Sequence, residues 1–233
     1  MTDCFANAKL SVVSADFCTT DEAARRLGMT RRRVQQLLDT GDLTRVARGL
    51  VDATSLDRHL AAHPTGRTRA WAESTAWAAV ALLSGARVDW LGASQTSRLR
   101  AALRDTADPA ELVARTRGRA VVRTFTGHSS AVRRLADRLV VADRATLGLT
   151  AGDVDWVDGY LDAAALDATA ASFGLREDPV GAITLRATAF DLDAVARLAD
   201  GPVLAALDAA TSLDPRERGV GERVLTGVLE GAR

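Results

Sequence analysis

The stretch from Thr19 to His63 constrains the fold most, because it predicts two short helices that meet at a glycine. Thr19 followed by Glu22 has the capping-box spacing, in which a hydroxyl accepts from a backbone N–H in the first turn of a helix. Gly28 ends this first helix, since glycine adopts the left-handed conformation that a tight turn needs. The stretch therefore begins with a helix and a sharp turn.

A second helix follows directly. Thr30 is placed to cap it, and Val34, Leu37 and Leu38 recur at helical spacing to form its apolar side. Gly41 then ends it. Two short helices around a glycine turn are typical of the helix-turn-helix, whose second helix enters the DNA major groove.

The outward face of this second helix carries arginine and glutamine. At about 100° per residue, Arg32 and Gln36 point away from the apolar side, Arg33 and Gln35 flank them, and Arg31 lies nearer the core. Arginine pairs with guanine O6 and N7, and glutamine pairs with adenine N6 and N7. A solvated face in an arginine-rich chain is the alternative. The cap, the turn and the flanking sequence favour DNA binding.

Residues 43–52 predict two short strands around a turn at Arg48–Gly49. Thr54 or Ser55 is then expected to cap a third helix. Residues 17–63, which include TTDEAARRLGMTRRRVQQLLDTGDL, the hairpin and the third helix, resemble the winged helix of excisionases and MerR-type regulators. The family often has an aromatic residue after the hairpin glycine, where this chain has Leu50.

The resemblance implies that the second helix faces DNA and that Arg48 lies at the tip of the wing, near phosphate or the minor groove. The helical-wheel positions of the second helix, its cap and the resemblance together define one set of candidate DNA-binding residues. Its members are Thr30, Arg31, Arg32, Arg33, Gln35, Gln36 and Arg48.

The whole chain is expected to be α+β and mostly helical, with two domains. Its 233 residues, 47% hydrophobic and 26% charged, are enough for more than one core. We predict a winged helix-turn-helix DNA-binding domain at 1–64. A larger, mainly helical α+β domain with a few strands follows at 65–233, for dimerisation or partner binding, and a subdivision near residue 145 is an option.

Other features limit the classes of protein. No run of about 18 apolar residues predicts a membrane span. The start of the chain does not have the pattern of a signal peptide. Cys4 and Cys18 lie outside any Cys-x-x-Cys spacing, so neither a disulfide framework nor a zinc site is predicted. A cytoplasmic location is expected.

Charge is distributed unevenly, although basic and acidic side chains cancel overall. Residues 1–66 carry 9 basic and 8 acidic side chains, residues 67–144 carry 14 and 7, and residues 145–233 carry 7 and 15. The basic middle can extend a phosphate footprint, and the acidic last third can face a basic protein partner. Ordinary solvated surfaces explain the same counts equally well.

The second domain is expected to alternate helices with a few strands. Residues 69–83, which include Trp71 and Trp77, predict a helix apolar nearly all round, buried in a core rather than in a dimer interface. Further helices are expected at 95–103 (capped by Ser94), 109–115, 128–139, 161–173, 191–198, 203–210 and 215–229, and strands at 119–126, 139–142 and 181–188.

No catalytic or metal motif is found. Asp153, Asp155 and Asp158 hint at a calcium loop, but the spacing is wrong for an EF-hand. His128 has no acidic, cysteine or second histidine partner at a useful spacing. Ser84–Gly85 lacks the paired carboxylates that a nucleotidyltransferase needs. We therefore predict no enzyme activity, no metal and no cofactor.

The last third carries a second resemblance. The strand GAITLRAT and the segment PVLAALDAATSLDPRERGVGERVL are similar to the C-terminal domain of AbiEi-type antitoxins, most closely at 206–210 and 213–217. The resemblance implies an operon repressor that counters a nucleotidyltransferase toxin, with the toxin contact in residues 152–230.

The predicted function is a sequence-specific transcriptional regulator of double-stranded DNA. It is expected to act as a homodimer and to serve as an autorepressing antitoxin with a cognate toxin partner. A DNA-binding regulator with a ligand-sensing second domain is the main alternative. An enzyme joined to a DNA-binding module is the weaker one.

Overall fold

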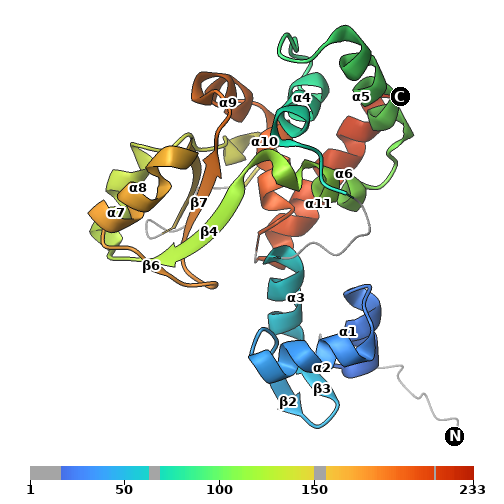
Figure 1. The fold of residues 1–233 in the computed structure, drawn as a ribbon, viewed down its shortest axis with the longest axis vertical. Coiled ribbons are helices and arrows are strands. Elements are labelled where there is room, and N and C mark those ends of the chain that lie inside the picture. The colour runs from blue at the N-terminus through green and yellow to red at the C-terminus, as the bar shows by residue number, and fades with distance from the viewer. Residues whose placement is uncertain (1–16, 63–68, 150–155, 213) are drawn as a thin grey trace, which may run out of the picture. The chain divides into compact units, whose positions relative to one another are not determined.

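The computed structural model describes residues 17–62, 69–149, 156–212 and 214–233, which form an α+β chain with two small sheets (Figure 1). The chain divides into two compact units, Met1–Thr65 and Gly66–Arg233. Each unit has its own sheet and its own apolar core. The two units are therefore described separately.

In the N-terminal unit, two helices precede a hairpin and a third helix. The elements are β1 (Phe17–Thr19), α1 (Thr20–Arg26), α2 (Arg31–Thr40), β2 (Arg45–Ala47), β3 (Leu50–Asp52) and α3 (Ala53–Ala62). The strand order is β1-β3-β2, with both pairings antiparallel. The hairpin was predicted, whereas β1 was missed because three residues are too few to show an alternating pattern.

The caps of α1 and α2 are those that the sequence predicts. Thr19 Oγ1 accepts from the Glu22 backbone N–H at 3.1 Å, and Gly28 turns the chain at φ +61°. The cap of α3 was predicted wrongly. Asp52 Oδ2 accepts from the Ser55 N–H at 2.6 Å, while the Ser55 hydroxyl bonds the Asp52 carbonyl oxygen and the Thr44 N–H.

The C-terminal unit contains eight α-helices and four strands among its described residues. Its helices are α4 (Glu73–Leu83), α5 (Ala93–Asp105), α6 (Pro109–Thr116), α7 (Ser129–Ala136), α8 (Leu166–Ser172), α9 (Leu192–Ala199), α10 (Pro202–Ala209) and α11 (Pro215–Gly231). Its strands are β4 (Val121–Thr126), β5 (Val157–Asp162), β6 (Arg176–Glu177) and β7 (Ile183–Thr188). Three short 3₁₀ helices, η1 (Arg117–Arg119), η2 (Arg144–Leu147) and η3 (Ala163–Ala165), connect them.

The larger sheet has the order β5-β7-β4-β6. β7 is its centre: β5 pairs with it in parallel, from Val157 opposite Ile183 to Asp162 opposite Thr188, and β4 pairs antiparallel on its other side. Phe125 and Leu185 are buried in one cluster with apolar residues of α7 and α8, and these two helices lie beside the sheet (Figure 1). On the other face of the sheet, Tyr160 of β5 and Thr188 of β7 contact Trp77 of the helical core.

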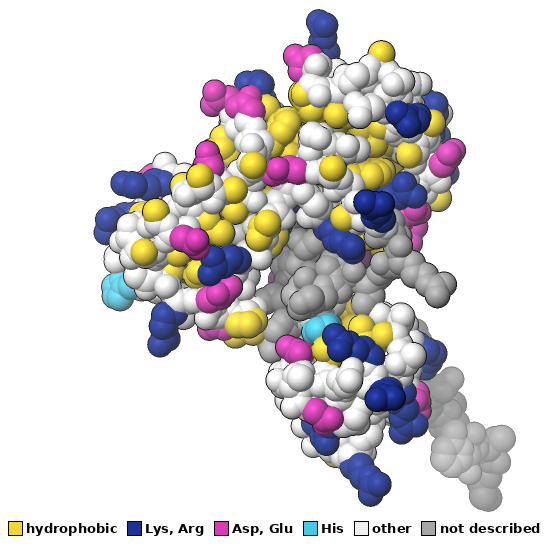
Figure 2. All heavy atoms as spheres, viewed as in Figure 1, with side chains coloured by type: hydrophobic (Ala, Val, Ile, Leu, Met, Phe, Trp, Pro, Cys, Tyr) yellow, Lys and Arg dark blue, Asp and Glu magenta, His cyan; other side chains and the backbone are white. Residues whose placement is uncertain are grey.

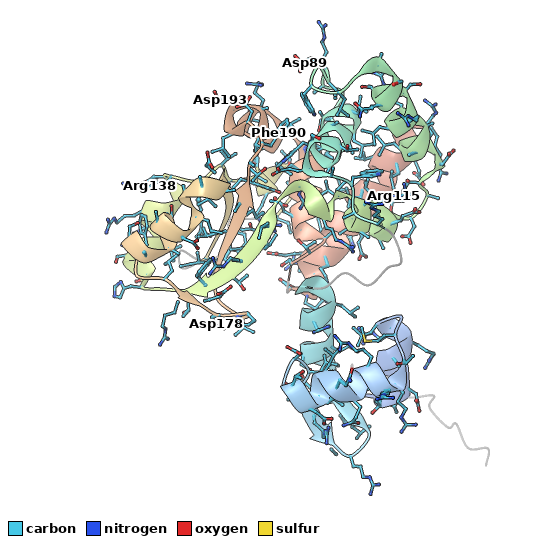
Figure 3. The ribbon with its side chains drawn as sticks, in the orientation of Figure 1. Asp89, Arg115, Arg138, Asp178, Phe190 and Asp193 are labelled. Carbon is cyan, nitrogen blue, oxygen red and sulfur yellow. The ribbon has the colours of Figure 1, made fainter. Side chains whose placement is uncertain are left out.

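That helical core is built around α4 and α10. Trp77 of α4 is fully buried, and its ring stacks on Phe190 at 5.7 Å between centroids and meets Tyr160 edge-on at 5.3 Å. Phe190 follows β7 and lies beside α4 and α9 (Figure 3). The indole N–H of Trp77 donates to Thr188 Oγ1 at 3.0 Å. The apolar helix was thus correctly predicted to be a core element, although it begins at Glu73 and leaves Trp71 outside.

Strand β5 is the largest error of the sequence prediction. No strand was predicted here and Asp158 was considered only as part of a calcium loop, yet Asp158 and Gly159 both lie inside the strand. A Cβ on Gly159 would lie 2.8 Å from the Leu139 Cβ, so glycine is needed where another segment crosses the strand. The predicted strand at 139–142 is reduced to a single bridge between Val140 and Tyr160.

Other boundaries were also wrong. Because β5 and η3 occupy its first residues, the helix predicted at 161–173 begins at Leu166. The helix predicted at 128–139 ends at Ala136. Gly92 rather than Ser94 precedes α5, and its backbone N–H donates to Gln95 Oε1 at 3.2 Å. Arg119 belongs to η1, and β4 begins only at Val121.

Candidate nucleic-acid interface

Helix α2 has one buried side and one polar side. Val34 and Leu37 are buried against the core of the N-terminal unit, and Gly41 ends the helix at φ +83°. At its start the Thr30 hydroxyl accepts from the Arg33 backbone N–H at 3.4 Å. Thr30 therefore acts as the cap of the helix, which limits its hydroxyl as a contact for a ligand.

The polar side carries all the arginine and glutamine side chains of the helix. All of them are exposed: Arg31, Arg32, Arg33, Gln35 and Gln36. Arginine side chains are distributed over the visible face of this unit, with a few acidic groups between them (Figure 2). The unit as a whole is close to neutral, so any attraction for an anion depends on where these arginines lie.

Three of these side chains, Arg33, Gln35 and Gln36, are held by hydrogen bonds along the helix. Arg33 Nη1 donates to Gln36 Oε1 at 3.2 Å, and Gln35 Nε2 donates to Asp39 Oδ1 at 3.0 Å. Arg45 of β2 also donates to that Asp39 oxygen, at 2.7 Å. Asp39 and Arg45 therefore belong to the polar face, although the prediction omitted them.

The signal for Asp39 was present in the sequence, because Gln35 and Asp39 are one helical turn apart. Arg45 could not be found this way, since it reaches Asp39 only after the chain turns back into the hairpin. Arg31 makes a longer ion pair, with Asp21 of α1 at 3.5 Å, and both side chains are about two-thirds exposed. Such a pair adds little stability but links the two helices.

Arg32 and Arg48 have no hydrogen-bond or ion-pair partner in the part of the chain that the structure describes. Arg48 is exposed in the turn between β2 and β3, next to Gly49 at φ +82°. Unpaired guanidinium groups at the surface are free to bind phosphate oxygens or base edges without first losing a protein partner.

A second polar cluster lies inside the C-terminal unit, and it is closed. Asp208 Oδ1 accepts from Arg119 Nη2 at 2.6 Å and from the Tyr160 hydroxyl at 2.7 Å. Arg186 binds both oxygens of Asp158, at 2.5 and 2.7 Å, and its Nη1 lies 3.3 Å from Asp208. Two arginines thus balance two aspartates, and Arg119, Arg186 and Asp208 are all buried.

The pKa shifts of Arg186 and Tyr160 are those of buried, paired groups with a structural role. Burial lowers the pKa of Arg186, but the carboxylates of Asp158 and Asp208 more than offset this and hold it well above its ordinary value. Burial raises the pKa of Tyr160, so the phenol stays protonated. Because the groups are paired and buried, this cluster can fasten α10 to the sheet but offers no open position for a substrate.

One of the three aspartates considered for a calcium site belongs to this cluster. Asp158 is bound to Arg186, and Asp153 and Asp155 lie outside the described residues. Among the described residues, no group of three His, Cys, Asp or Glu side chains could hold a metal ion. His128 accepts from the Ser130 N–H at 3.2 Å and caps α7.

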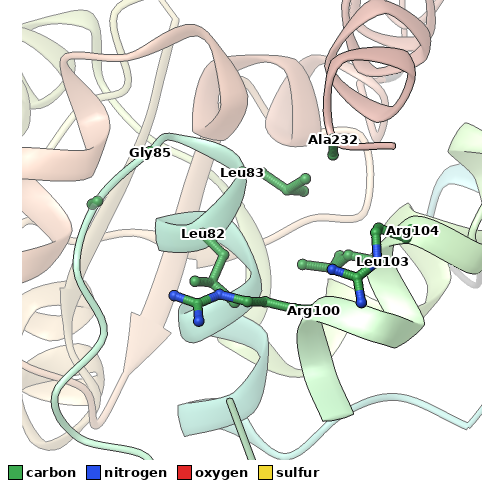
Figure 4. A pocket seen from close by; sticks show the side chains of 8 residues that line it. Leu82, Leu83, Gly85, Arg100, Leu103, Arg104 and Ala232 are labelled. Carbon is green, nitrogen blue, oxygen red and sulfur yellow. The ribbon is translucent and has the colours of Figure 1, made fainter. Parts of the chain in front are cut away.

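A shallow cavity of about 290 Å³ lies between α4, α5 and the end of α11 (Figure 4). Leu82, Leu83 and Leu103 form its apolar part, and Arg100 and Arg104 stand one helical turn apart on its wall. This volume is at the lower limit of small-molecule sites. The lining suits a compact organic anion.

No helix in the described part of the chain is long and apolar enough to cross a membrane. Compared with protein-family models, curated proteins and solved structures, the chain shows no significant match to any of them.

Proposed function

We propose that the chain is a sequence-specific DNA-binding transcriptional regulator, and that its N-terminal unit is a winged helix-turn-helix. The observation that carries the proposal is helix α2, which is packed on Val34 and Leu37 and presents arginines and glutamines on its exposed side. Helix α1, a tight turn, α2, a hairpin and α3 follow in the order of that motif.

In this proposal α2 enters the major groove and Arg48 contacts the backbone or the minor groove. The unpaired Arg32 is the principal base-reading residue, because its guanidinium can donate two hydrogen bonds at once, to O6 and N7 of guanine. Arg31 and Arg33 lie beside it and add phosphate contacts, which supply affinity without specificity. The near-neutral charge of residues 1–66 makes one unit a weak binder, so we propose that a homodimer reads two half-sites.

The test compares the wild type with an Arg32→Ala, Gln36→Ala double variant on the DNA upstream of the chain's own gene. Each lost base contact costs about 1–3 kcal/mol, so the double variant should bind at least roughly tenfold more weakly. Arg197→Ala is the control, because Arg197 is exposed on α9 and has no partner among the described residues. Equal affinity of the double variant and the wild type would overturn the proposal.

The role that we propose for this regulator is that of an autorepressing antitoxin, on the basis of the resemblance at 206–217. Residues 145–233 carry 15 acidic and 7 basic side chains, which suits contact with a basic toxin. The neighbouring gene should be toxic when expressed alone and harmless when the chain is co-expressed. A neighbour that is harmless alone excludes this role but leaves DNA binding intact.

The cavity between α4, α5 and α11 favours a second candidate function, a regulator whose C-terminal unit senses a small organic anion. Arg100 and Arg104 would bind its charged group while the leucines cover its apolar part. A change in operator affinity with added ligand, lost in an Arg100→Ala, Arg104→Ala variant, would support it. No catalytic step is proposed, because the buried polar cluster is internally paired.

A further inference from the structure

The hydrogen bond between Arg33 and Gln36 determines which way the Gln36 amide faces. A guanidinium group has five donors and no acceptor, so only the carbonyl oxygen of the amide can face it. Gln36 Oε1 accepts from Arg33 Nη1 at 3.2 Å, and a flipped amide would place two donors against each other. The outward group of Gln36 is therefore its Nε2, which is a donor.

The neighbouring Gln35 has the opposite polarity. Its partner Asp39 is a carboxylate, which only accepts, so Nε2 of Gln35 must face inward at 3.0 Å. Arg45 reinforces this arrangement, because it binds the same Asp39 oxygen and balances its charge. The free group of Gln35 is therefore Oε1, an acceptor.

Arg32 lies one turn before Gln36, on the same line along the helix. It has no partner among the described residues and presents donors only. The line from Arg32 to Gln36 is thus a row of donors, whereas the adjacent Gln35 offers an acceptor.

This polarity bears on the choice of base. The usual pairing of glutamine with adenine uses both amide groups, Oε1 toward N6 and Nε2 toward N7. In α2 that oxygen already faces Arg33, and the adenine N6 donors would approach the positive guanidinium. Guanine presents two acceptors, O6 and N7, and thymine presents only O4.

Resting on the proposed function, we infer that α2 reads a guanine-containing half-site, with guanine opposite both Arg32 and Gln36. Arg33 is a positioning residue in this inference, because it sets the orientation of the Gln36 amide. Gln35 faces a base that donates in the major groove, adenine or cytosine. The general pairing of glutamine with adenine therefore does not apply to Gln36 in this inference.

The experiment is a selection of binding sites from a randomised duplex library with the full-length wild type and two variants. Gln36→Ala should lose the preference at one position only, which identifies the base that faces Gln36. At that position the wild type should select guanine, and replacing guanine by adenine should weaken binding roughly tenfold.

Arg33→Met is the decisive variant, because it removes the guanidinium partner and keeps an exposed, helix-compatible stem. It should turn the preference at the Gln36 position from guanine to adenine, since the freed amide can then make both bonds. The readout is the base selected by Arg33→Met and not its affinity, because loss of the Arg33 charge lowers the affinity for all sequences equally. Arg197→Ala should leave the selected sequence unchanged.

The outcomes separate this inference from the function on which it rests. Selection of adenine by the wild type at the Gln36 position, or retention of guanine by Arg33→Met, overturns the inference while DNA reading stands. If the wild type enriches no sequence at all, the proposed function fails, and the inference fails with it.

Discussion

The two units use arginine in opposite ways. In the N-terminal unit Arg32 and Arg48 are exposed and, among the described residues, have no partner. In the C-terminal unit Arg119 and Arg186 are about 3% and 4% exposed and bind two aspartates and a tyrosine. The comparison teaches that arginine content alone says little about function, because burial and pairing decide what each guanidinium can bind.

The energetic consequences of the two settings differ as well. An exposed arginine loses little when it is removed, because water solvates its neighbours equally well. A buried arginine compensates carboxylates that have lost their water, so its removal leaves a charge unpaired in an apolar interior. Stability and DNA affinity should therefore respond to different arginines.

The largest effect on stability is expected for Arg186→Ala. This change leaves the largely buried Asp158 carboxylate without its two hydrogen bonds from Arg186 and should lower the free energy of unfolding by about 3–5 kcal/mol. Urea unfolding followed by tryptophan fluorescence is the measurement, because all four tryptophans lie in residues 66–233.

The matched control is Arg197→Ala, which removes an exposed arginine without a described partner from the same unit, so the same fluorescence reports both variants. It should change the free energy of unfolding by no more than about 0.5 kcal/mol. Equal unfolding midpoints for the two variants would break the distinction between the two kinds of arginine. If Arg186→Ala does not fold, the milder tyrosine variant tests the same cluster.

Tyr160→Phe should have an intermediate effect. It removes the hydroxyl that donates to Asp208 and accepts from Arg119, at a cost of about 1–3 kcal/mol. Unfolding midpoints in urea measure this cost. A phenylalanine variant as stable as the wild type would show that this hydroxyl contributes nothing to the cluster.

The burial of Tyr160 also predicts that the folded chain loses stability at alkaline pH. Because burial raises the pKa of Tyr160 in the folded chain above the unfolded value of about 10, its contribution to the free energy of unfolding is complete below pH 10 and declines as the pH rises further. Tyr160 is the only tyrosine, so phenolate absorbance reports it alone. Phenolate should form together with unfolding, and a simple titration near pH 10 in the folded protein would contradict the burial.

The smallest effect is expected for Arg123→Ala. Arg123 bonds Glu177 and Asp167 at the surface of the larger sheet, and these two carboxylates are 59% and 90% exposed. The hydrogen bond from Arg123 lowers the pKa of Glu177. The change in unfolding midpoint should be smaller than for either buried variant and should disappear in 1 M salt, where the screening length is about 3 Å. A loss of stability that does not depend on salt would show that Arg123 behaves like the buried arginines.

The sequence allowed good predictions where the signal is local. The caps at Thr19 and Thr30 were predicted, and the helices predicted to begin at residues 109 and 215 do begin there, because such signals depend on groups only two or three residues apart. The central strand β7 was found from its run of β-forming residues. Strand β5 was missed because its charged and glycine residues are explained only by Arg186 and by the segment that crosses Gly159.

The sequence by itself determined the two helices around Gly28, the hairpin and the outward face of α2, because spacing and glycine conformation act over a few residues. Only the tertiary structure decided the rest. It brought Asp208 to Arg119 across 89 positions and Arg45 to Asp39 across the hairpin. Side-chain orientation on α2 also depends on such partners, since a hydrogen bond to a charged neighbour selects which end of an amide faces outward.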